Sequence, residues 1–328
     1  MSVRRSAGVI VGALLGLAHA DWAAAQSGGA SFPARPVRVI VPQSPGGTTD
    51  LTARLLAPRL AERFGQSVVV DNRPGAGSLV GTDLVAKSAP DGHTLLVVAS
   101  SLAIMPSMYK SLPFDPVKDF APITTLSVYP NLLLIHPSVP ANSVKELIAL
   151  ARAKPGMLNY ASGGTGTGTQ LGAELFKTMA GIDMVHVPYK GGGPAMNAIM
   201  GGQVQLYFAA MPSALVMVKH GKLKAIAVTS AKRAAALPEL PSIAEAGLPG
   251  YEQTTWNGLL APARTPRPII DKLKYETQAV LAMPATRERF AADGSEAQIM
   301  TPDEFAALIK REVVKWGKVI HSAGIKPE

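Results

Sequence analysis

Short apolar runs alternate with longer amphipathic segments from residue 37 onward, and this alternation predicts strands followed by helices. An apolar run predicts a strand over residues 37–41, and leucines at helical spacing predict a helix over residues 49–64. Pro58 lies inside this helix and is expected to bend it or split it, because proline removes a backbone donor. The pattern then predicts a strand, a helix and a strand over residues 68–70, 79–87 and 94–99.

The same alternation continues through the middle of the chain. Residues 132–135 predict a strand, and residues 143–153 predict a helix that Ser143 and Glu146 would begin as a capping box. Four further strands, each pair separated by a helical stretch, are predicted at 158–161, 184–187, 204–208 and 223–228. Strands that alternate with helices indicate an α/β fold with parallel sheets and helices on both faces. The C-terminal part predicts helices alone, over residues 266–282, 286–292 and 302–323.

Composition sets the size of the fold and excludes several chemistries. The chain has 328 residues, which at roughly 150 residues per domain suggests about two domains. Cysteine is absent from the sequence, which excludes a disulfide scaffold, a thiolate metal site and a cysteine nucleophile. The formal net charge of +9 suits an anionic partner, namely nucleic acid, a membrane surface or a small acid.

The N-terminus narrows this choice of partner. Arg4 and Arg5 precede an apolar run over residues 7–18, and small residues follow at 23–25. This order is typical of a secretory signal peptide, residues 1–25, with cleavage after Ala25 and export from the cytoplasm. The apolar run is shorter than the roughly 20 residues that span a bilayer. Export makes nucleic acid an unsuitable partner, and the basic residues are scattered without runs.

Two glycine-rich turns, over residues 42–50 and 162–169, each connect a predicted strand to a predicted helix. Glycine lets a backbone approach a ligand closely, and the start of a helix presents unpaired N–H groups to an anion. Hydroxyl donors are added by Thr48, Thr49, Ser162, Thr167 and Thr169. The alternative is that both turns only cap their helices, with Thr49 and Asp50 as capping residues.

Motifs for cofactors and catalysis are missing from the sequence. Neither turn contains the lysine of a phosphate-binding loop, and no dinucleotide fingerprint follows in register. No G-x-S-x-G or H-E-x-x-H motif occurs, and no acidic cluster suggests a metal site. Beyond the expected signal peptide, the histidines lie far apart in the sequence, at His93, His136, His186, His220 and His321. We therefore expect a binding protein that is no enzyme and has no cofactor or metal; a secreted α/β enzyme acting on acidic substrates and a ligand-dependent signalling adaptor are the alternatives.

Several longer motifs resemble one known family. They are Val41-Pro42-x-x-Pro45-Gly46-Gly47-x-x-Asp50, Asp71-Asn72-Arg73-Pro74-Gly75-Ala76-Gly77 and Val187-Pro188-Tyr189-Lys190-Gly191. The chain resembles the Bug family of periplasmic solute receptors, which serve tripartite tricarboxylate transporters. The resemblance implies a type II periplasmic-binding-protein fold, with two α/β lobes joined by two crossover strands near residues 129–131 and 256–262. Lobe 1 would comprise residues 32–130 plus 257–328, lobe 2 would comprise residues 131–256, and the ligand cleft would lie between them.

The resemblance also implies a ligand site and partners. In the family, the two glycine turns pinch a ligand carboxylate between them, which carries over onto Gly46, Gly47, Thr48, Asp50, Ser162, Gly166, Thr167 and Thr169. The expected partners are a small organic acid and the membrane subunits of such a transporter, with the receptor acting as a monomer. Two positions depart from the family pattern, since Ala209 stands where Asp is frequent and Gln170 where His is frequent. Ala209 is expected to line the cleft and to leave room for an uncharged part of the ligand.

Overall fold

The computed structural model describes residues 32–327, so the expected signal peptide lies outside the described residues. The strands are β1 (Val37–Val41), β2 (Val68–Asn72), β3 (Thr94–Ala99), β4 (Phe120–Ile135), β5 (Asn159–Ser162), β6 (Val185–Pro188), β7 (Leu206–Ala210), β8 (Lys224–Val228), β9 (Thr254–Pro262) and β10 (Glu296–Ala297). The helices are α1 (Thr48–Phe64), the short η2 (Ala76–Ser78), α2 (Leu79–Ala86), α3 (Ser101–Met108), α4 (Val144–Ala153), α5 (Gly168–Ala180), α6 (Gly192–Met200), α7 (Met211–Lys219), α8 (Arg267–Ala282), α9 (Pro284–Ala292) and α10 (Pro302–Ser322).

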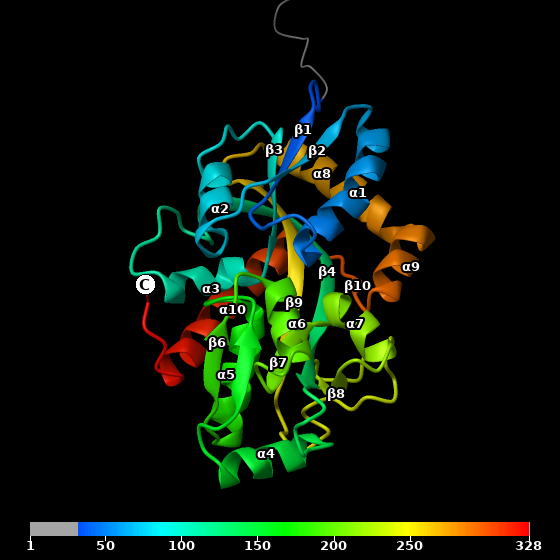
Figure 1. Ribbon diagram of the computed structural model, residues 1–328. Helices are drawn as coiled ribbons and strands as arrows, with labels where there is room; N and C mark the ends of the chain where they lie inside the picture. Colours follow the sequence, from blue (N-terminus) through cyan, green and yellow to red (C-terminus); the bar gives the residue numbers. More distant parts are fainter. Residues whose placement is uncertain (1–31, 328) are drawn as a thin grey trace, which may run out of the picture.

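The elements form two halves, one above the other in Figure 1. The upper half contains β1–β3, β9, η2, α1–α3, α8 and α9, and the lower half contains β5–β8 and α4–α7. The strands are paired in the order β2-β1-β3-β9-β4-β7-β5-β6, with β8 and β10 also paired to β4. The expectation of parallel sheets holds for β1–β3 and for β5–β7, whereas every pair that involves β4 or β9 is antiparallel.

One long strand, β4, belongs to both halves. Its residues up to Pro130 pair with β9, and its residues from Asn131 onward pair with β7. The change of partner falls in the segment 129–131, where the first crossover was expected. The segment 256–262, expected as the second crossover, lies within β9 and pairs with both β3 and β4. The exact lobe boundaries stay a prediction.

The sheet of the upper half has a hydrophobic core on each of its two faces. Val37, Val39 and Val41 face a cluster with α1 and α8, whereas Ile40 faces a second cluster with α3 and α10. Successive side chains of a strand point to opposite faces of the sheet, so a continuous apolar run buries both faces. The sheet of the upper half is therefore covered by helices on both sides.

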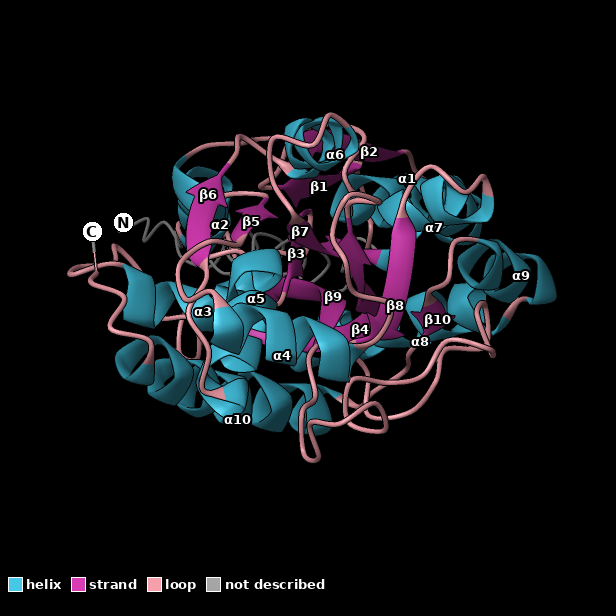
Figure 2. Ribbon diagram, turned by 60° about the horizontal axis from the view of Figure 1, so that its bottom comes forward, coloured by secondary structure: helices cyan, strands magenta, loops and turns pink. Residues whose placement is uncertain are grey.

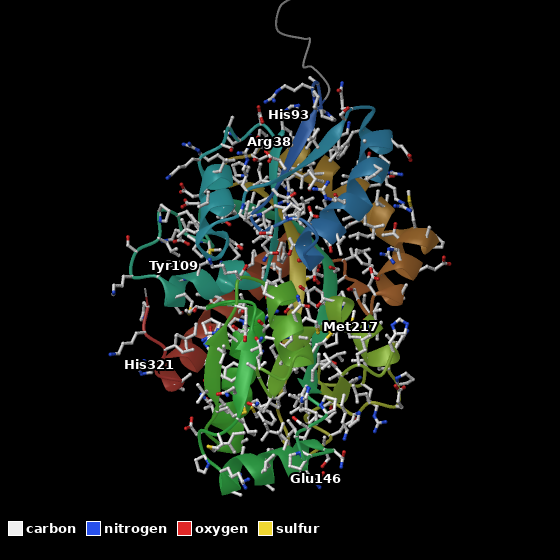
Figure 3. The ribbon with its side chains drawn as sticks, in the orientation of Figure 1. Arg38, His93, Tyr109, Glu146, Met217 and His321 are labelled. Atoms are coloured by element: carbon white, nitrogen blue, oxygen red, sulfur yellow. The ribbon has the colours of Figure 1, made fainter. Side chains whose placement is uncertain are left out.

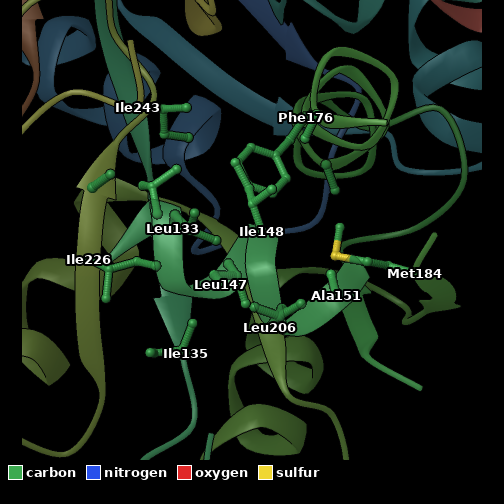
Figure 4. Close-up of a cluster of buried hydrophobic side chains, with 14 of the residues drawn as sticks. Leu133, Ile135, Leu147, Ile148, Ala151, Phe176, Met184, Leu206, Ile226 and Ile243 are labelled. Atoms are coloured by element: carbon green, nitrogen blue, oxygen red, sulfur yellow. The ribbon is translucent and has the colours of Figure 1, made fainter. Parts of the chain in front are cut away.

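The lower half is built in the same way, as Figure 2 shows from below. One face of its sheet packs against α4 and α5, where Leu147 and Phe176 meet Leu133 and Leu206 (Figure 4). The other face packs against α6 and α7. The last helix, α10, lies along α3 and also reaches α5 of the lower half.

The structure adds local detail at three places, and a bend at Pro58 stays a prediction. The helix α1 runs without a split through Pro58, and the guanidinium of Arg59 donates to the carbonyl of Leu55 beside the proline. Ser143 caps α4 by accepting from the N–H of Glu146, but the carboxylate of Glu146 accepts from Asn142 instead of Ser143. The capping box predicted there is thus only half formed. The elements α3 and β10 were not predicted at all.

A tight contact between β9 and α10 yields a stability prediction. A Cβ atom at Gly258 would lie 2.1 Å from Cζ of Phe305, which is fully buried against Trp256. We expect Gly258→Ala to lower the free energy of unfolding by about 1–3 kcal/mol, because overpacked cores must shift. Chemical denaturation measures this loss. Gly193→Ala is the control, since no atom lies within 4 Å of its added Cβ; equal stability of the two variants would contradict the contact.

Candidate functional site

The first glycine turn is held by a carboxylate. Gly46 has a φ of +81°, and its N–H donates to Oδ2 of Asp50 over 2.8 Å. The same carboxylate accepts from Nε of Arg54 at 2.9 Å and from the amide of Asn72 at 3.0 Å. Asp50 is only 1% exposed, and burial raises its pKa, but these hydrogen bonds outweigh burial and hold the pKa below its ordinary value. Asp50 therefore remains charged and shapes the turn.

The second glycine turn is held by the equivalent bond. Gly166 has a φ of +74°, and its N–H donates to Oε1 of Gln170 over 2.7 Å. Because an N–H can only meet the amide oxygen, Nε2 of Gln170 faces Nδ1 of His186, 3.3 Å away. This nitrogen must accept, so His186 is neutral and its Nε2–H donates to Oγ of Ser162 over 2.7 Å. Gln170, which stands where His is frequent in the family, thus fixes the conformation of the second turn.

His186 lies in a half-buried cluster of ionisable groups. Its ring stacks on Tyr160 with centroids 5.0 Å apart, and the Tyr160 hydroxyl donates to Glu174, which also pairs with Lys177 at 3.3 Å. Burial lowers the pKa of His186, the charge of Glu174 opposes this, and the charge of Lys177 lowers it further. Burial and the adjacent Glu174 carboxylate raise the pKa of Tyr160. The imidazole is therefore kept in its neutral form.

The hydroxyl groups of the second turn bond inside it. Oγ1 of Thr167 donates to the carbonyl of Gly164 over 2.7 Å and meets Oγ1 of Thr169 at 2.8 Å. Oγ1 of Thr169 in turn accepts from the N–H of Gly163 at 2.9 Å. Thr167 is the N-cap residue of α5, yet no side chain caps this helix end. The first backbone N–H groups of α5 therefore remain available to hydrogen-bond a ligand.

At the first turn, the hydroxyl of Thr49 does not cap the helix. The N-cap residue of α1 is Gly47, and no side chain caps this helix end either. The hydroxyl of Thr49 instead donates to Oδ1 of Asn257 over 2.9 Å, which ties α1 to β9. The hydroxyl of Thr48 is hydrogen-bonded to the phenol of Tyr129 on β4, and burial raises the pKa of that phenol. The first turn is therefore anchored to the two central strands.

A cavity of about 310 Å³ lies between the two halves. The lower half contributes the second glycine turn, and the upper half contributes η2 and α3. The lining residues are Ala76, Gly77, Ser101, Ile104, Met105, Met108, Tyr109, Gly163, Gly164, Thr165, Gly166 and Thr167. In Figure 3, Tyr109 lies at the end of α3, at the level where the halves meet. The hydroxyl of Tyr109 donates to the carbonyl of Ala76 over 2.7 Å, which closes this wall.

The predicted site residues divide into three groups. Gly166 and Thr167 line the cavity, whereas Ser162 and Thr169 support the same turn from behind. The residues of the first turn lie beside β4, where Thr48 meets Tyr129, and do not line this cavity; they are Gly46, Gly47, Thr48 and Asp50. Ala209 is fully buried in a hydrophobic cluster with Leu132 and is not part of the cavity lining. Its contact with a ligand stays a prediction.

The sequence reasoning missed the upper wall of the cavity. Ala76 and Gly77 belong to the quoted motif at residues 71–77, but no role was assigned to them. The helix α3 carries no polar stripe, so its sequence gave no sign of facing a ligand. Within residues 32–327, no three or more His, Cys, Asp or Glu side chains form a group that could hold a metal ion. No helix in this part of the chain is long and apolar enough to cross a membrane.

Comparisons with known proteins agree over nearly the whole chain. Residues 52–325 match the family described as the tripartite tricarboxylate transporter family receptor. The protein BugT of Bordetella pertussis is 38% identical over 298 residues, covering 90% of this chain and 91% of BugT. Rpa4515 of R. palustris, solved with adipate, has a TM-score of 0.85 at 37% identity, covering 90% and 100% of the two chains. MatC from Rhodopseudomonas palustris with bound malate has a TM-score of 0.80 at 32% identity, covering 88% and 100%.

Sheet order, cavity and structural neighbours together define a class. The protein is a two-lobed α/β solute-binding protein with the type II periplasmic fold, as the family resemblance implied. Within this class, the chain belongs to the receptors of the tripartite tricarboxylate transporter family, which include the Bug proteins. Members of this family are periplasmic receptors, and the resemblance to the Bug family is confirmed.

The neutral state of His186 predicts a pH-dependent stability. In the unfolded chain the imidazole takes up a proton near pH 6.5, whereas in the folded protein burial lowers its pKa. The unfolded state therefore binds more protons as the pH falls below 6.5, and the stabilisation present above this pH is lost as the pH falls through the folded-state pKa. We expect His186→Gln, which keeps polar groups in place, to weaken the fall in melting temperature on acidification.

Thermal unfolding of both proteins at a series of pH values measures this effect. His220→Gln is the control, because His220 is exposed at the end of α7. An acid-induced fall in the melting temperature that is equal in the wild type and in His186→Gln would contradict the assignment.

Proposed function

We propose that the mature chain, exported with cleavage after Ala25, is an extracytoplasmic receptor for a small organic carboxylate. It binds the ligand between lobe 1 (residues 32–130 and 257–328) and lobe 2 (residues 131–256). It then delivers the ligand to the membrane subunits of a tripartite tricarboxylate-type transporter. In this proposal it acts as a monomer, without a cofactor and without changing the ligand. The observation that carries the proposal is the cavity between the halves, with the uncapped start of α5 at its edge.

The start of α5 at the edge of the cavity suits an anionic ligand. Thr167, the N-cap residue of α5, lines the cavity, and the first N–H groups of the helix follow it directly. A helix N-terminus attracts negative charge through these N–H groups and through the helix dipole. The related structures hold adipate in Rpa4515 and malate in MatC, which are both carboxylates. A carboxylate bound at the start of α5 is therefore our proposal for this chain.

An enzyme is the alternative, and the Ser162–His186 pair is the feature that would serve it. A serine nucleophile needs an accessible oxygen and a histidine that a carboxylate orients. The side chain of Ser162 is fully buried and bonds to both the N–H and the carbonyl of Gly164. The other nitrogen of His186 faces the amide of Gln170. The pair thus supports the glycine turn, and the geometry favours a receptor.

Ligand binding is the direct test of this proposal. A carboxylate at about 100 times its dissociation constant should stabilise the native state by about 2.7 kcal/mol, if unfolding is two-state. Thermal shift of ligand-free protein across a panel of mono-, di- and tricarboxylates measures the effect. Mass spectrometry of the bound and released ligand then separates a receptor, which returns it unchanged, from an enzyme. A panel without any stabilising acid would contradict the proposal.

The glycine turn predicts the effect of one substitution on binding. In Gly166→Val the added Cβ would lie 3.1 Å from Cγ of Met108 at a φ that L-residues rarely adopt. The side chain would fill the edge of the cavity and distort the turn, so we expect the affinity for the best carboxylate to fall at least tenfold, about 1.4 kcal/mol. Isothermal titration calorimetry measures the affinity.

Gly181→Val is the matched control for backbone strain. Gly181 also has a positive φ, of +60°, but no atom lies within 4 Å of its added Cβ. It is the C-cap residue of α5, at the far end of the helix from the cavity. Both variants should lose some stability, and only Gly166→Val should lose affinity. Equal affinities of Gly166→Val and the wild type would remove the turn from the binding site.

A further inference from the structure

The two halves are built alike, and the cavity joins unlike parts of them. In the upper half, the parallel strands β1 and β2 lead into the first glycine turn and into η2. In the lower half, the parallel strands β5 and β6 lead into the second glycine turn and into α6. The cavity lies between the second turn and η2. The equivalent pair in this arrangement is the first turn and the start of α6.

The start of α6 offers hydrogen-bond donors. Its N-cap residue is Gly191, no side chain caps it, and its first turn contains no acidic residue. Gly192 and Gly193 are exposed and carry the first two N–H groups of the helix, whereas Pro194 has none. Free N–H groups at a helix start attract an anion, and here they are accessible to one.

Lys190, which lies directly before this helix start, adds a positive charge to the same end. Its side chain is exposed, and within residues 32–327 no carboxylate pairs with it. A cation at a helix N-terminus is unfavourable, because the helix dipole is positive there. The charge at this end of α6 is therefore unbalanced in the protein alone, and an anion would balance it.

A buried phenol points at the same helix start. Tyr207 on β7 is 1% exposed, and its hydroxyl oxygen is 3.3 Å from the position of a Cβ atom on Gly192. Among the described residues, none forms a hydrogen bond with this hydroxyl. Burial and the neighbouring phenol of Tyr129 raise the pKa of Tyr207, so the hydroxyl keeps its proton and can donate. Tyr207 thus offers a ligand one donor rather than a contact surface, and a ligand oxygen would supply the missing acceptor.

Tyr129 connects this place with the first glycine turn. Its phenol is hydrogen-bonded to Thr48, the first residue of α1, and it is close enough to Tyr207 to affect the pKa of that residue. The start of α1 has no capping side chain either, and the carboxylate of Asp50 is already paired with Arg54. In Figure 1, α6 lies in the upper part of the lower half. The first turn and the start of α6 are therefore parts of one polar region that spans both halves.

We propose that the start of α6, with Tyr207 and Lys190, is a second anion subsite, and that it binds a second carboxylate of the ligand. The inference rests on the proposed carboxylate-binding function, in which the first carboxylate lies at the start of α5. The two places are adjacent, since the backbone nitrogen of Gly192 is 3.5 Å from the position of a Cβ on Gly163, which lines the cavity. One ligand with two acidic groups can therefore bridge them.

Matched pairs of acids test this subsite on the wild-type protein. Succinate is compared with butanoate, glutarate with pentanoate and adipate with hexanoate, so that within each pair a methyl group replaces the second carboxylate. We expect the diacid of at least one pair to have a dissociation constant at least about tenfold below that of its monoacid by calorimetry, because hydrogen bonds to a charged group are the strong ones. Monoacids that bind as tightly as their diacids in every pair overturn the inference.

The same titrations separate a failure of the inference from a failure of the proposed function. A receptor that binds monocarboxylates without preferring the matched diacids overturns the inference and leaves the carboxylate-binding function standing. A protein that binds no mono-, di- or tricarboxylate overturns the function, and the inference with it. A diacid or triacid that binds where no monoacid does supports both.

Tyr207→Phe removes the proposed donor and nothing else. Because this hydroxyl bonds to no group of the protein, we expect the melting temperature to be unchanged or higher, while the dissociation constant of the tightest diacid or triacid rises at least about tenfold. Tyr251→Phe is the matched control, since Tyr251 is equally buried and its hydroxyl donates to the carbonyl of Gly172 over 2.9 Å. The control should lose stability and keep its affinity for that acid. A Tyr207→Phe protein with wild-type affinity overturns the inference.

Lys190→Gln tests the charge at an exposed position, where folding is not at risk. We expect the affinity for the same acid to fall about threefold at low ionic strength, and the difference to shrink as salt is added, because salt screens exposed charges. Lys219→Gln is the control, since it removes the same charge from the last turn of α7, at a helix C-terminus. Equal affinities of the two lysine variants would show that no anion binds beside Lys190. This pair decides the matter even if Tyr207→Phe does not fold.

Discussion

A single kind of hydrogen bond, from a glycine N–H to a side chain four residues later, sets the geometry of both halves. Gly46 donates to Asp50, and Gly166 donates to Gln170. Each acceptor lies in the first turn of a helix, and each is backed by a residue on the neighbouring strand, Asn72 or His186. The bond holds the glycine at positive φ and points the start of the helix outward. The same bond thus shapes the turn that precedes each of the two helix N-termini.

The two halves reach this common geometry with different chemistry. Asp50 is charged and needs Arg54 beside it, whereas Gln170 is neutral and depends on the tautomer of His186. The first turn is therefore fixed by an ion pair that is insensitive to pH near neutrality. The second turn depends on His186, whose imidazole must stay neutral and whose pKa burial lowers below the ordinary value. The cavity borders the second turn and not the first. The conformation of its polar wall therefore depends on the neutral state of His186.

Local patterns predicted most of the fold and half of the site. The strand–turn–helix units were predictable because their periodicity and glycines are local, and residues 42–50 and 162–169 do form the two turns. The hydrogen bonds that fix the second turn were not predictable, since Gln170 and His186 lie 16 residues apart and meet only once β5 and β6 pair. Nor was the wall formed by α3, whose residues are mostly apolar and include Pro106. The burial of Ala209 depends on packing around β7, which no local pattern specifies, and its contact with a ligand stays a prediction.

The last helix has a mechanical consequence for the protein. Trp316 and Ile320 of α10 pack with Ile104 and Met108 of the upper half and also with Leu171 of the lower half. Any swing of one half relative to the other must slide Leu171 over the surface of α10, or expose it to water. Such exposure opposes opening in proportion to the apolar area uncovered. The C-terminal helix thus couples the two halves through the same packed cluster that borders the cavity at Ile104 and Met108.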